Sequence, residues 1–266
     1  MEKTRQSVVT VATSDFCDGL HKAFNSFSIN PFLELHAFII GDKLPDYRVP
    51  QVTYHLEKPD LSFGHPMREL YYRRFLFMDQ IGAEYVLLVD NSDVLCVQPL
   101  PELPLLLRGA AFAACVEHAG GRYLEGQQYT SSYVNAGVTY WHVPSSLPMR
   151  EDIVRRGRSR FRSVEDQLSL NEVIQTRYYD AMILLPCQYG YRACLEPVHI
   201  RGWPTVNSLD GVVVYHNRHC IEQAKKLLPV KPKASLQDLE SDERPLNSFE
   251  KFWRRVQLRL KPHSVK

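Results

Sequence analysis

The stretch YVLLVDNSDVLC, residues 85–96, places acidic residues directly after a run of apolar ones. Residues 85–89 are apolar enough to form a strand that is buried on both faces. Asp90 and Asp93 then follow, and two neighbouring carboxylates repel each other unless a cation lies between them. Oxygen ligands of this kind suit Mg²⁺ or Mn²⁺. The alternative is that the two aspartates form an Asx turn or cap a helix.

Other apolar runs of strand length occur along the chain, and stretches of helical period separate them. The runs that predict strands are 7–13, 33–40, 85–89, 111–116, 137–143, 181–185 and 211–215. The stretches that predict helices are 16–28, 66–81, 165–176 and 219–228. Strands and helices in alternation predict an α/β fold with a mainly parallel central sheet flanked by helices. Ligands bind beyond the carboxyl ends of such strands, which is where Asp90 lies.

Length and composition predict one large domain with an appendage. The chain has 266 residues, of which 44% are hydrophobic, so it can bury a full core. We expect a catalytic domain at 1–228, a linker or surface loop at 229–248, and a basic amphipathic helix at 249–266. The six Lys and Arg residues of this last segment exceed the chain's net charge of +2. The basic charge therefore belongs to the appendage, and we expect no nucleic-acid partner.

Five short motifs occur in an order that resembles one enzyme family. They are YYRRF (71–75), LLVDNSDVLCVQPL (87–100), YVNAGVTYWH (133–142), EDQLSLNEVI (165–174) and VVYHNRH (213–219). Together they resemble the landmarks of the family 8 glycosyltransferases, and the order matches across residues 7–220. The resemblance implies a GT-A-type nucleotide-diphospho-sugar transferase fold and metal-assisted sugar transfer from a nucleotide-sugar donor.

The resemblance also implies a metal site made of Asp90, Asp93 and His216. Mn²⁺ or Mg²⁺ at this site would bridge the protein to the donor diphosphate. The family's motif is Asp-x-Asp, whereas this chain has Asp-x-x-Asp, so the second ligand is either the main chain of Ser92 or the side chain of Asp93. We favour Asp93 because a hard cation prefers a charged ligand. The alternative for His216 is a histidine at a strand end that bonds the backbone.

The residues that the resemblance assigns to the donor nucleotide-sugar come from several of these motifs. They are Ala12, Thr13, Asp15, Phe16, Arg74, Asn91, Ser92, Ala136 and Gly137. Ala12, Thr13 and Asp15 would bond the base and ribose, and Phe16 would stack on the base. Arg74 would reach the donor phosphate or sugar; alternatively, it is a surface arginine on an amphipathic helix.

Three further residues are implied to lie near the transferred sugar. Asn135 would contact the donor sugar just before a strand, or would instead belong to a tight turn. Asp166 and Gln167, at the start of a helix, would lie near the anomeric carbon and are the remaining candidate catalytic residues.

The resemblance implies a hexosyltransferase that uses UDP-hexose as the default donor and retains the anomeric configuration. Two alternatives stay open. The acceptor would be a hydroxyl of a saccharide or glycolipid, as in polysaccharide or lipopolysaccharide biosynthesis. The alternatives are a non-catalytic nucleotide-sugar-binding module and an inverting GT-A enzyme of another family. A P-loop or dinucleotide-binding loop is not found in the sequence.

The segment FEKFWRRVQLRLK, residues 249–261, has an apolar stripe at helical spacing flanked by cations. This pattern predicts an interfacial helix on an anionic membrane surface, or else a helix that closes the catalytic domain. The sequence shows neither a secretory signal nor an apolar run long enough to span a membrane. We therefore expect a cytoplasmic protein, peripheral at the inner membrane face.

Overall fold

The computed structural model describes residues 4–14, 17–91, 93–116, 133–159, 166–191 and 211–216. The chain divides into two compact units, Met1–Pro229 and Val230–Lys266, and all described residues belong to the first. The predicted helix at 219–228, the predicted linker and the predicted basic helix lie outside the described residues. No helix in the described part of the chain is long and apolar enough to cross a membrane.

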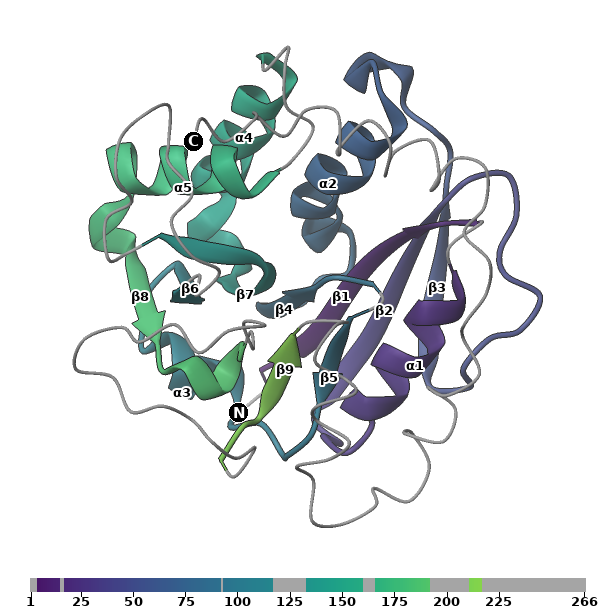
Figure 1. The fold of residues 1–266 in the computed structure, drawn as a ribbon, viewed down its shortest axis with the longest axis horizontal. Helices are drawn as coiled ribbons and strands as arrows, with labels where there is room; N and C mark the ends of the chain where they lie inside the picture. The colour runs from purple at the N-terminus through teal and green to yellow at the C-terminus, as the bar shows by residue number, and fades with distance from the viewer. Residues whose placement is uncertain are drawn as a thin grey trace, which may run out of the picture. The chain divides into compact units, whose positions relative to one another are not determined.

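A seven-stranded sheet forms the centre of the first unit (Figure 1). Its strands, in chain order, are β1 (Gln6–Thr13), β2 (Leu33–Ile40), β3 (Val52–Glu57), β4 (Tyr85–Val89), β6 (Phe112–Val116), β7 (Val134–His142) and β8 (Met182–Leu185). Their spatial order is β3-β2-β1-β4-β7-β6-β8. Neighbouring strands pair in parallel except at β7, which runs antiparallel to both β4 and β6. The predicted α/β fold with a mainly parallel sheet is confirmed.

A separate two-stranded sheet lies beside the carboxyl end of β4. It pairs β5 (Val94–Cys96) antiparallel with β9 (Val214–His216). Figure 1 shows the two strands side by side, drawn below β4. The predicted strand at 211–215 therefore exists in part, but it belongs to this small sheet and not to the central one.

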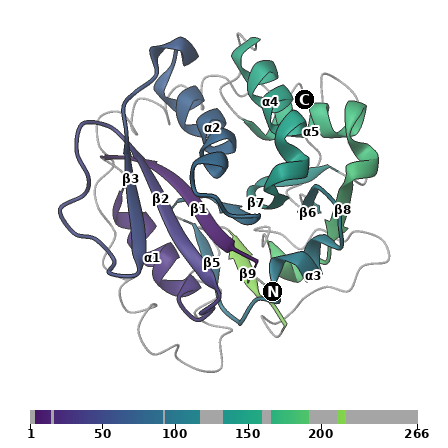
Figure 2. The ribbon, with the colours of Figure 1, turned by 180° about the vertical axis from the view of Figure 1, so that it is seen from behind.

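Helices cover both faces of the central sheet, as Figures 1 and 2 show from opposite sides. Helices α1 (Cys17–Phe27) and α3 (Leu103–Leu107) lie on one face. Helices α2 (Pro66–Phe77), α4 (Val143–Ser159) and α5 (Asp166–Arg177) lie on the other. Short 3-10 helices occur at η2 (Leu61–Phe63), η3 (Met78–Gln80), η4 (Tyr179–Ala181) and η5 (Cys187–Tyr189).

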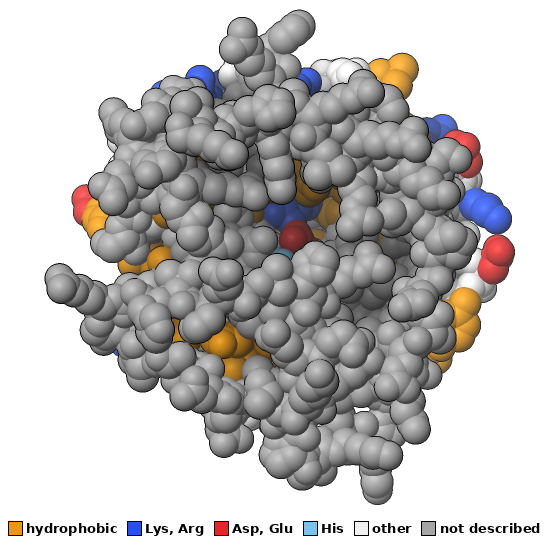
Figure 3. Space-filling view, in the orientation of Figure 1, with side chains coloured by type: hydrophobic (Ala, Val, Ile, Leu, Met, Phe, Trp, Pro, Cys, Tyr) orange, Lys and Arg blue, Asp and Glu red, His pale blue; other side chains and the backbone are white. Residues whose placement is uncertain are grey.

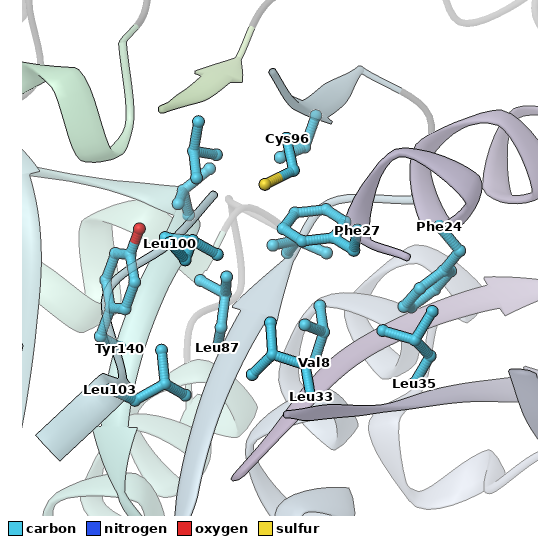
Figure 4. Packing of buried hydrophobic residues seen from close by; sticks show 14 of the residues in the cluster. Val8, Phe24, Phe27, Leu33, Leu35, Leu87, Cys96, Leu100, Leu103 and Tyr140 are labelled. Atoms are coloured by element: carbon cyan, nitrogen blue, oxygen red, sulfur yellow. The ribbon is translucent and has the colours of Figure 1, made fainter. Parts of the chain in front are cut away.

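Each face of the sheet has its own hydrophobic cluster. On the α1 side, side chains of the central strands pack against Phe24 and Phe27 of α1, Leu103 of α3 and Cys96 of β5 (Figure 4). The small sheet thus sits on the same core as α1, and this core fixes its position next to β4. On the other face, Tyr72 and Phe75 of α2 are fully buried. Burial of this kind is the main source of stability in a domain of this size.

The start of α2 shows why the chain turns where it does. Gly64 ends η2 with φ +69°, a left-handed conformation that glycine adopts without a steric cost. His65 then caps α2, because its side chain accepts a hydrogen bond from the backbone N–H of Met67, and Pro66 occupies the first turn. This helix has to begin here for Arg74, two turns later, to lie against the end of β4.

Candidate functional site

The two sheets bring the predicted metal ligands together. Asp90 follows the last residue of β4, and Asp93 precedes the first residue of β5. His216 is the last residue of β9, where it pairs with Val94. The His216 Nε2 atom lies 3.5 Å from Asp90 Oδ2 and 3.6 Å from Asp93 Oδ2. One ligand atom from each of the three residues lies within 4.8 Å of the others.

The donor set and the available space fit a hard divalent cation. Two carboxylates and an imidazole are ligands that Mn²⁺ or Mg²⁺ accepts. A Cβ atom on Gly137 would lie 2.2 Å from His216 Cε1 and 2.5 Å from Asp90 Oδ2, so glycine alone leaves room for these side chains. Figure 3 shows acidic, basic and histidine side chains gathered near the middle of the viewed face. The element that follows Asp93 is the strand β5, so the alternative in which the aspartates cap a helix is wrong.

Arg74 is buried between two carboxylates. It lies in the last turn of α2, and its side chain is only 5% exposed. Its Nη1 atom donates to Asp90 Oδ1 at 2.6 Å, and its Nη2 atom donates to the Ala136 carbonyl at 2.7 Å and lies 2.5 Å from Asp166 Oδ2. The alternative of a surface arginine is therefore wrong. The structure gives its guanidinium protein partners on both sides, which the sequence did not indicate.

The Asn-Ala-Gly motif lies inside β7, not before it. The pairing of β6 with β7 shifts between Ala114 and Val116, so that Cys115 stands opposite the four residues 135–138. Such a bulge leaves backbone groups without strand partners and is frequent beside active sites. The expectation that this motif precedes the strand or forms a tight turn is wrong. The sequence reads as a turn because Asn and Gly favour one locally.

Side chains of the site take the place of the missing strand partners. The Ala136 N–H donates to Gln167 Oε1 at 3.1 Å, and the Gly137 N–H donates to Asn135 Oδ1 at 2.8 Å. Asn135 also donates from Nδ2 to Gln167 Oε1 at 3.2 Å. The Gly137 carbonyl accepts from the Asp90 N–H at 2.9 Å. The bulge is therefore bonded directly to the loop that carries Asp90, the first predicted metal ligand.

Asn171 is a site residue that the sequence analysis missed. Its side chain bonds both backbone groups of Val134, accepting from the N–H at 2.7 Å and donating to the carbonyl at 2.8 Å. It lies within the predicted motif at 165–174, four residues after Gln167, on the same face of α5. That spacing was the only signal in the sequence that Asn171 faces β7.

The two acids on either side of Arg74 differ in their pKa values. Burial raises the pKa of Asp90, but hydrogen bonding from His216 and the charge of Arg74 outweigh this effect and hold it below its usual range. Burial raises the pKa of Asp166 to about 6, because the attraction of Arg74 offsets only part of the lost hydration and Asp90 adds repulsion. Burial lowers the pKa of Arg74, and the two carboxylates more than restore it.

A pocket of about 650 Å³ lies at the carboxyl ends of β1, β2 and β3 and at the start of α2. Thr13 and Ser14 line it, together with His65 and Pro66. Ala12 is fully buried in the core and does not line this pocket. Of the other predicted donor contacts, Asn91 directly follows Asp90, and Asp15, Phe16 and Ser92 lie outside the described residues.

No protein-family model matches this sequence, and no curated protein sequence matches it. Several solved structures of glycosyltransferases do resemble the structure. The galactosyltransferase LgtC, in complex with donor and acceptor sugar analogues, matches with a TM-score of 0.54 at 17% identity, over 85% of this chain and 98% of LgtC. Mouse xyloside xylosyltransferase 1 matches with a TM-score of 0.52 at 11% identity, over 81% of this chain and 97% of the mouse protein.

A third match is the glycosyltransferase GlyE of Streptococcus pneumoniae TIGR4, with a TM-score of 0.52 at 16% identity, over 96% of this chain and 60% of GlyE. At these identities the likeness establishes the fold, and membership of family 8 stays a prediction. The order of the central strands, the reversed β7 and these matches lead to one conclusion: the chain has the fold of the GT-A glycosyltransferases.

Proposed function

We propose that this protein is a metal-assisted glycosyltransferase that moves a sugar, by default a hexose from a UDP donor, to a hydroxyl of a saccharide or glycolipid. The observation that carries the proposal is the convergence of Asp90, Asp93 and His216 above Gly137, at the carboxyl end of β4. The fold supports it, since ligands of open α/β sheets bind at this edge.

Asp90, Asp93 and His216 would hold Mn²⁺ or Mg²⁺. An ion bound there would neutralise the charge that develops on the leaving diphosphate. Of the two candidates for the second ligand, Ser92 lies outside the described residues. The distance of 3.6 Å between Asp93 Oδ2 and His216 Nε2 supports the choice of Asp93.

The pocket beside Thr13 would hold the nucleoside of the donor. β1 and β4 are parallel neighbours, so their carboxyl ends lie at the same edge of the sheet. A base and ribose in the pocket would therefore lie on the side of β1 away from β7, and the diphosphate would extend toward Asp90. Asp15 and Phe16 stay predicted contacts of the base.

The bulge and the start of α5 would hold the sugar. Asn135 and Gln167 are bonded to each other, and Gly137 keeps the backbone free of side-chain atoms beside Asp90. We also propose retention of configuration without a covalent carboxylate intermediate. Asp166 supports this route, because its side chain is 7% exposed and its Oδ2 atom is held by Arg74, which leaves it poorly placed as a nucleophile.

Donor turnover measures the proposal directly. The purified full-length chain, screened against nucleotide-sugars with Mn²⁺, should release nucleoside diphosphate, and EDTA should stop the release. Asp93→Asn should abolish turnover while leaving the thermal unfolding midpoint of the metal-free protein nearly unchanged, because the residue is a partly exposed ligand. Wild-type activity and metal dependence in Asp93→Asn would show that Asp93 is not a ligand.

The same experiment separates the alternatives. A thermal shift with a nucleotide-sugar and Mn²⁺, but no turnover with any acceptor or water, would favour a non-catalytic binding module. NMR of the first-formed product would assign its anomeric configuration, and an inverted product would contradict the retaining mechanism.

A further inference from the structure

The two oxygens of Asp90 face different partners. Oδ1 accepts a hydrogen bond from Arg74 Nη1 at 2.6 Å, whereas Oδ2 lies 3.5 Å from His216 Nε2. The same Oδ2 atom is the one that a Cβ on Gly137 would approach to 2.5 Å. One oxygen of Asp90 is therefore committed to the protein, and the other points to the position of the metal.

Arg74 is itself fixed in orientation. Its Nη2 atom contacts the Ala136 carbonyl at 2.7 Å and Asp166 Oδ2 at 2.5 Å, on the side opposite Asp90. A guanidinium is planar, so contacts at both terminal nitrogens determine the direction of the whole group. Ala136 belongs to the bulge of β7, and Asp166 begins α5, so three separate elements set this direction.

A carboxylate that is held in this way can bind a metal ion through only one oxygen and from only one direction. Groups that orient metal ligands from behind raise affinity because the ligand does not have to be ordered when the ion binds, and their loss commonly weakens binding 10- to 100-fold. Removing Arg74 would also leave the partly exposed carboxylate of Asp90 and the buried carboxylate of Asp166 near each other without the compensating charge of the guanidinium.

We propose that Arg74 is a positioning residue of the metal site, which fixes Asp90 as a ligand through Oδ2 alone and links its orientation to Asp166 and to the β7 bulge. The inference rests on the proposed function only in requiring that the site bind a divalent cation. It differs from a direct contact of Arg74 with the donor phosphate or sugar, since it predicts an effect on the metal when no nucleotide is present.

Titration of the full-length protein with Mn²⁺ alone, followed by isothermal calorimetry and by the electron paramagnetic resonance signal of free Mn²⁺, tests the proposal. Arg74→Gln should raise the Kd for Mn²⁺ between 10- and 100-fold. Arg74→Lys should raise it at least about tenfold, because an ammonium group keeps the charge but cannot contact Asp90 and Asp166 as a fork. The lysine variant serves as the test if the glutamine variant does not fold.

Arg73→Gln is the matched control. Arg73 is the neighbouring residue on α2, and it forms its own ion pairs with Glu57 at 2.7 Å and Glu69 at 2.6 Å. Its loss should lower the unfolding midpoint but leave the Kd for Mn²⁺ within about twofold of the wild-type value. An equal loss of Mn²⁺ affinity in this control would mean that any destabilisation of α2 impairs the site, which would overturn the specific role of Arg74.

Two outcomes separate this inference from the proposed function. If the wild-type protein binds neither Mn²⁺ nor Mg²⁺, the proposed function fails and the positioning role fails with it. If the wild-type protein binds Mn²⁺ and both Arg74 variants bind it equally tightly, the positioning role alone is wrong. A loss confined to UDP affinity in the presence of Mn²⁺ would likewise overturn it, in favour of a direct contact with the donor.

Discussion

Gly137 lies directly beside the side chains that would hold the metal ion. Gly137→Ala places a Cβ atom 2.2 Å from His216 Cε1, so the imidazole or Asp90 has to move. We expect Mn²⁺ binding to be lost, with a decrease of about 1–3 kcal/mol in the free energy of unfolding, typical of overpacking. Calorimetric titration and chemical denaturation measure the two effects.

Gly190→Ala is the control for this substitution. The new Cβ atom would meet Cys115 Sγ at 3.0 Å, so this substitution also crowds a buried side chain, but not one of the predicted metal ligands. The control should lose stability and keep its Mn²⁺ affinity. Normal Mn²⁺ binding in Gly137→Ala would show that the ligands do not converge as described.

Asp166 should make the protein less stable as the pH rises, which is the opposite of the usual effect of a carboxylate. Its pKa is raised from 3.8 to about 6, so the folded state binds the proton more tightly than the unfolded state. The free energy of unfolding should therefore decrease as the pH rises from about 4 to 6, and change little above that range as far as this group is concerned. One pKa unit corresponds to about 1.4 kcal/mol, so the decrease is on the order of 2–3 kcal/mol.

Asp166→Asn removes this titration. We expect the free energy of unfolding of the metal-free variant to fall less between pH 4 and 6 than that of the wild type, in urea denaturation at fixed ionic strength. Asp90, whose pKa is lowered, contributes in the opposite direction at lower pH in both proteins, so the difference between the two curves between pH 4 and 6 reports mainly on Asp166. Parallel curves would contradict the raised pKa.

At the scale of elements, the β7 bulge depends on α5. Asn171 satisfies the buried N–H and carbonyl of Val134 together. Asn171→Ala leaves both groups without these partners, and each buried group left unsatisfied costs about 1–3 kcal/mol. We expect a destabilisation of about 2–4 kcal/mol by chemical denaturation. Thr176→Ala, at an exposed position of the same helix, should stay within about 0.5 kcal/mol of the wild type.

Gln167 joins the bulge to the predicted sugar site. Gln167→Ala should lower kcat far more than it weakens nucleotide binding, because the affected contact lies beside the reacting sugar and not beside the base. Steady-state kinetics with the best donor, together with calorimetry of UDP binding, separate the two quantities. Gln175→Ala, two turns further along α5, should leave kcat unchanged. A change confined to nucleotide affinity would contradict the position of Gln167.

The sequence predicts the elements that local patterns determine. The continuous apolar run of β4 and the mostly apolar run of β2 give these strands their bounds, because strands buried on both faces need no regular polar alternation. α4 was not predicted, since Pro144 and Pro148 and the serines between them favour a loop; burial of its Met149 and Ile153 outweighs that preference. The pairing of β5 with β9 was not predictable either, because Cys96 and Val214 lie 118 positions apart in the chain.

The candidate site likewise has a part that the sequence predicts and a part that only the packing determines. The residue types and the order of the motifs pointed to Asp90, Asp93 and His216, and these residues do lie together. The hydrogen-bond and ion-pair partners of Arg74 could not be predicted from the sequence, because they depend on how α2 packs against β4, β7 and α5. Local spacing says which face of a helix an arginine occupies, whereas its partners come from the packing of separate elements.

At the scale of the whole molecule, the described arginines at the end of α4 are largely neutralised by neighbouring acids. Arg155 is paired with Asp152, and Arg156 with Glu172. Arg158 lies 3.9 Å from Asp60. Since these charges already have partners, we expect them to contribute little to binding an anionic surface. The unbalanced positive charge of the chain then lies in residues 249–266.

The pattern of that last segment predicts membrane association. Phe249, Phe252, Trp253, Val256 and Leu260 recur at helical spacing, and five Lys and Arg residues flank them within residues 249–261. Apolar side chains at such spacing enter the headgroup boundary, and each cation near an anionic surface contributes about 1 kcal/mol. A lipid-borne saccharide acceptor, if the proposed function holds, would then be presented at the surface where the protein binds. The competing interpretation is that the same apolar stripe packs on the catalytic domain.

Sedimentation with anionic and neutral liposomes distinguishes the two interpretations. Full-length protein should sediment with anionic liposomes at low salt and less at high salt, because screening weakens the attraction of the cations. A chain ending at Ser248 should stay in solution. The double variant Arg155→Gln and Arg158→Gln should sediment like the wild type, since those arginines have acidic partners. Equal binding by the full-length and shortened chains, or none to anionic liposomes, would leave residues 249–261 as a packing segment and place the acceptor in solution.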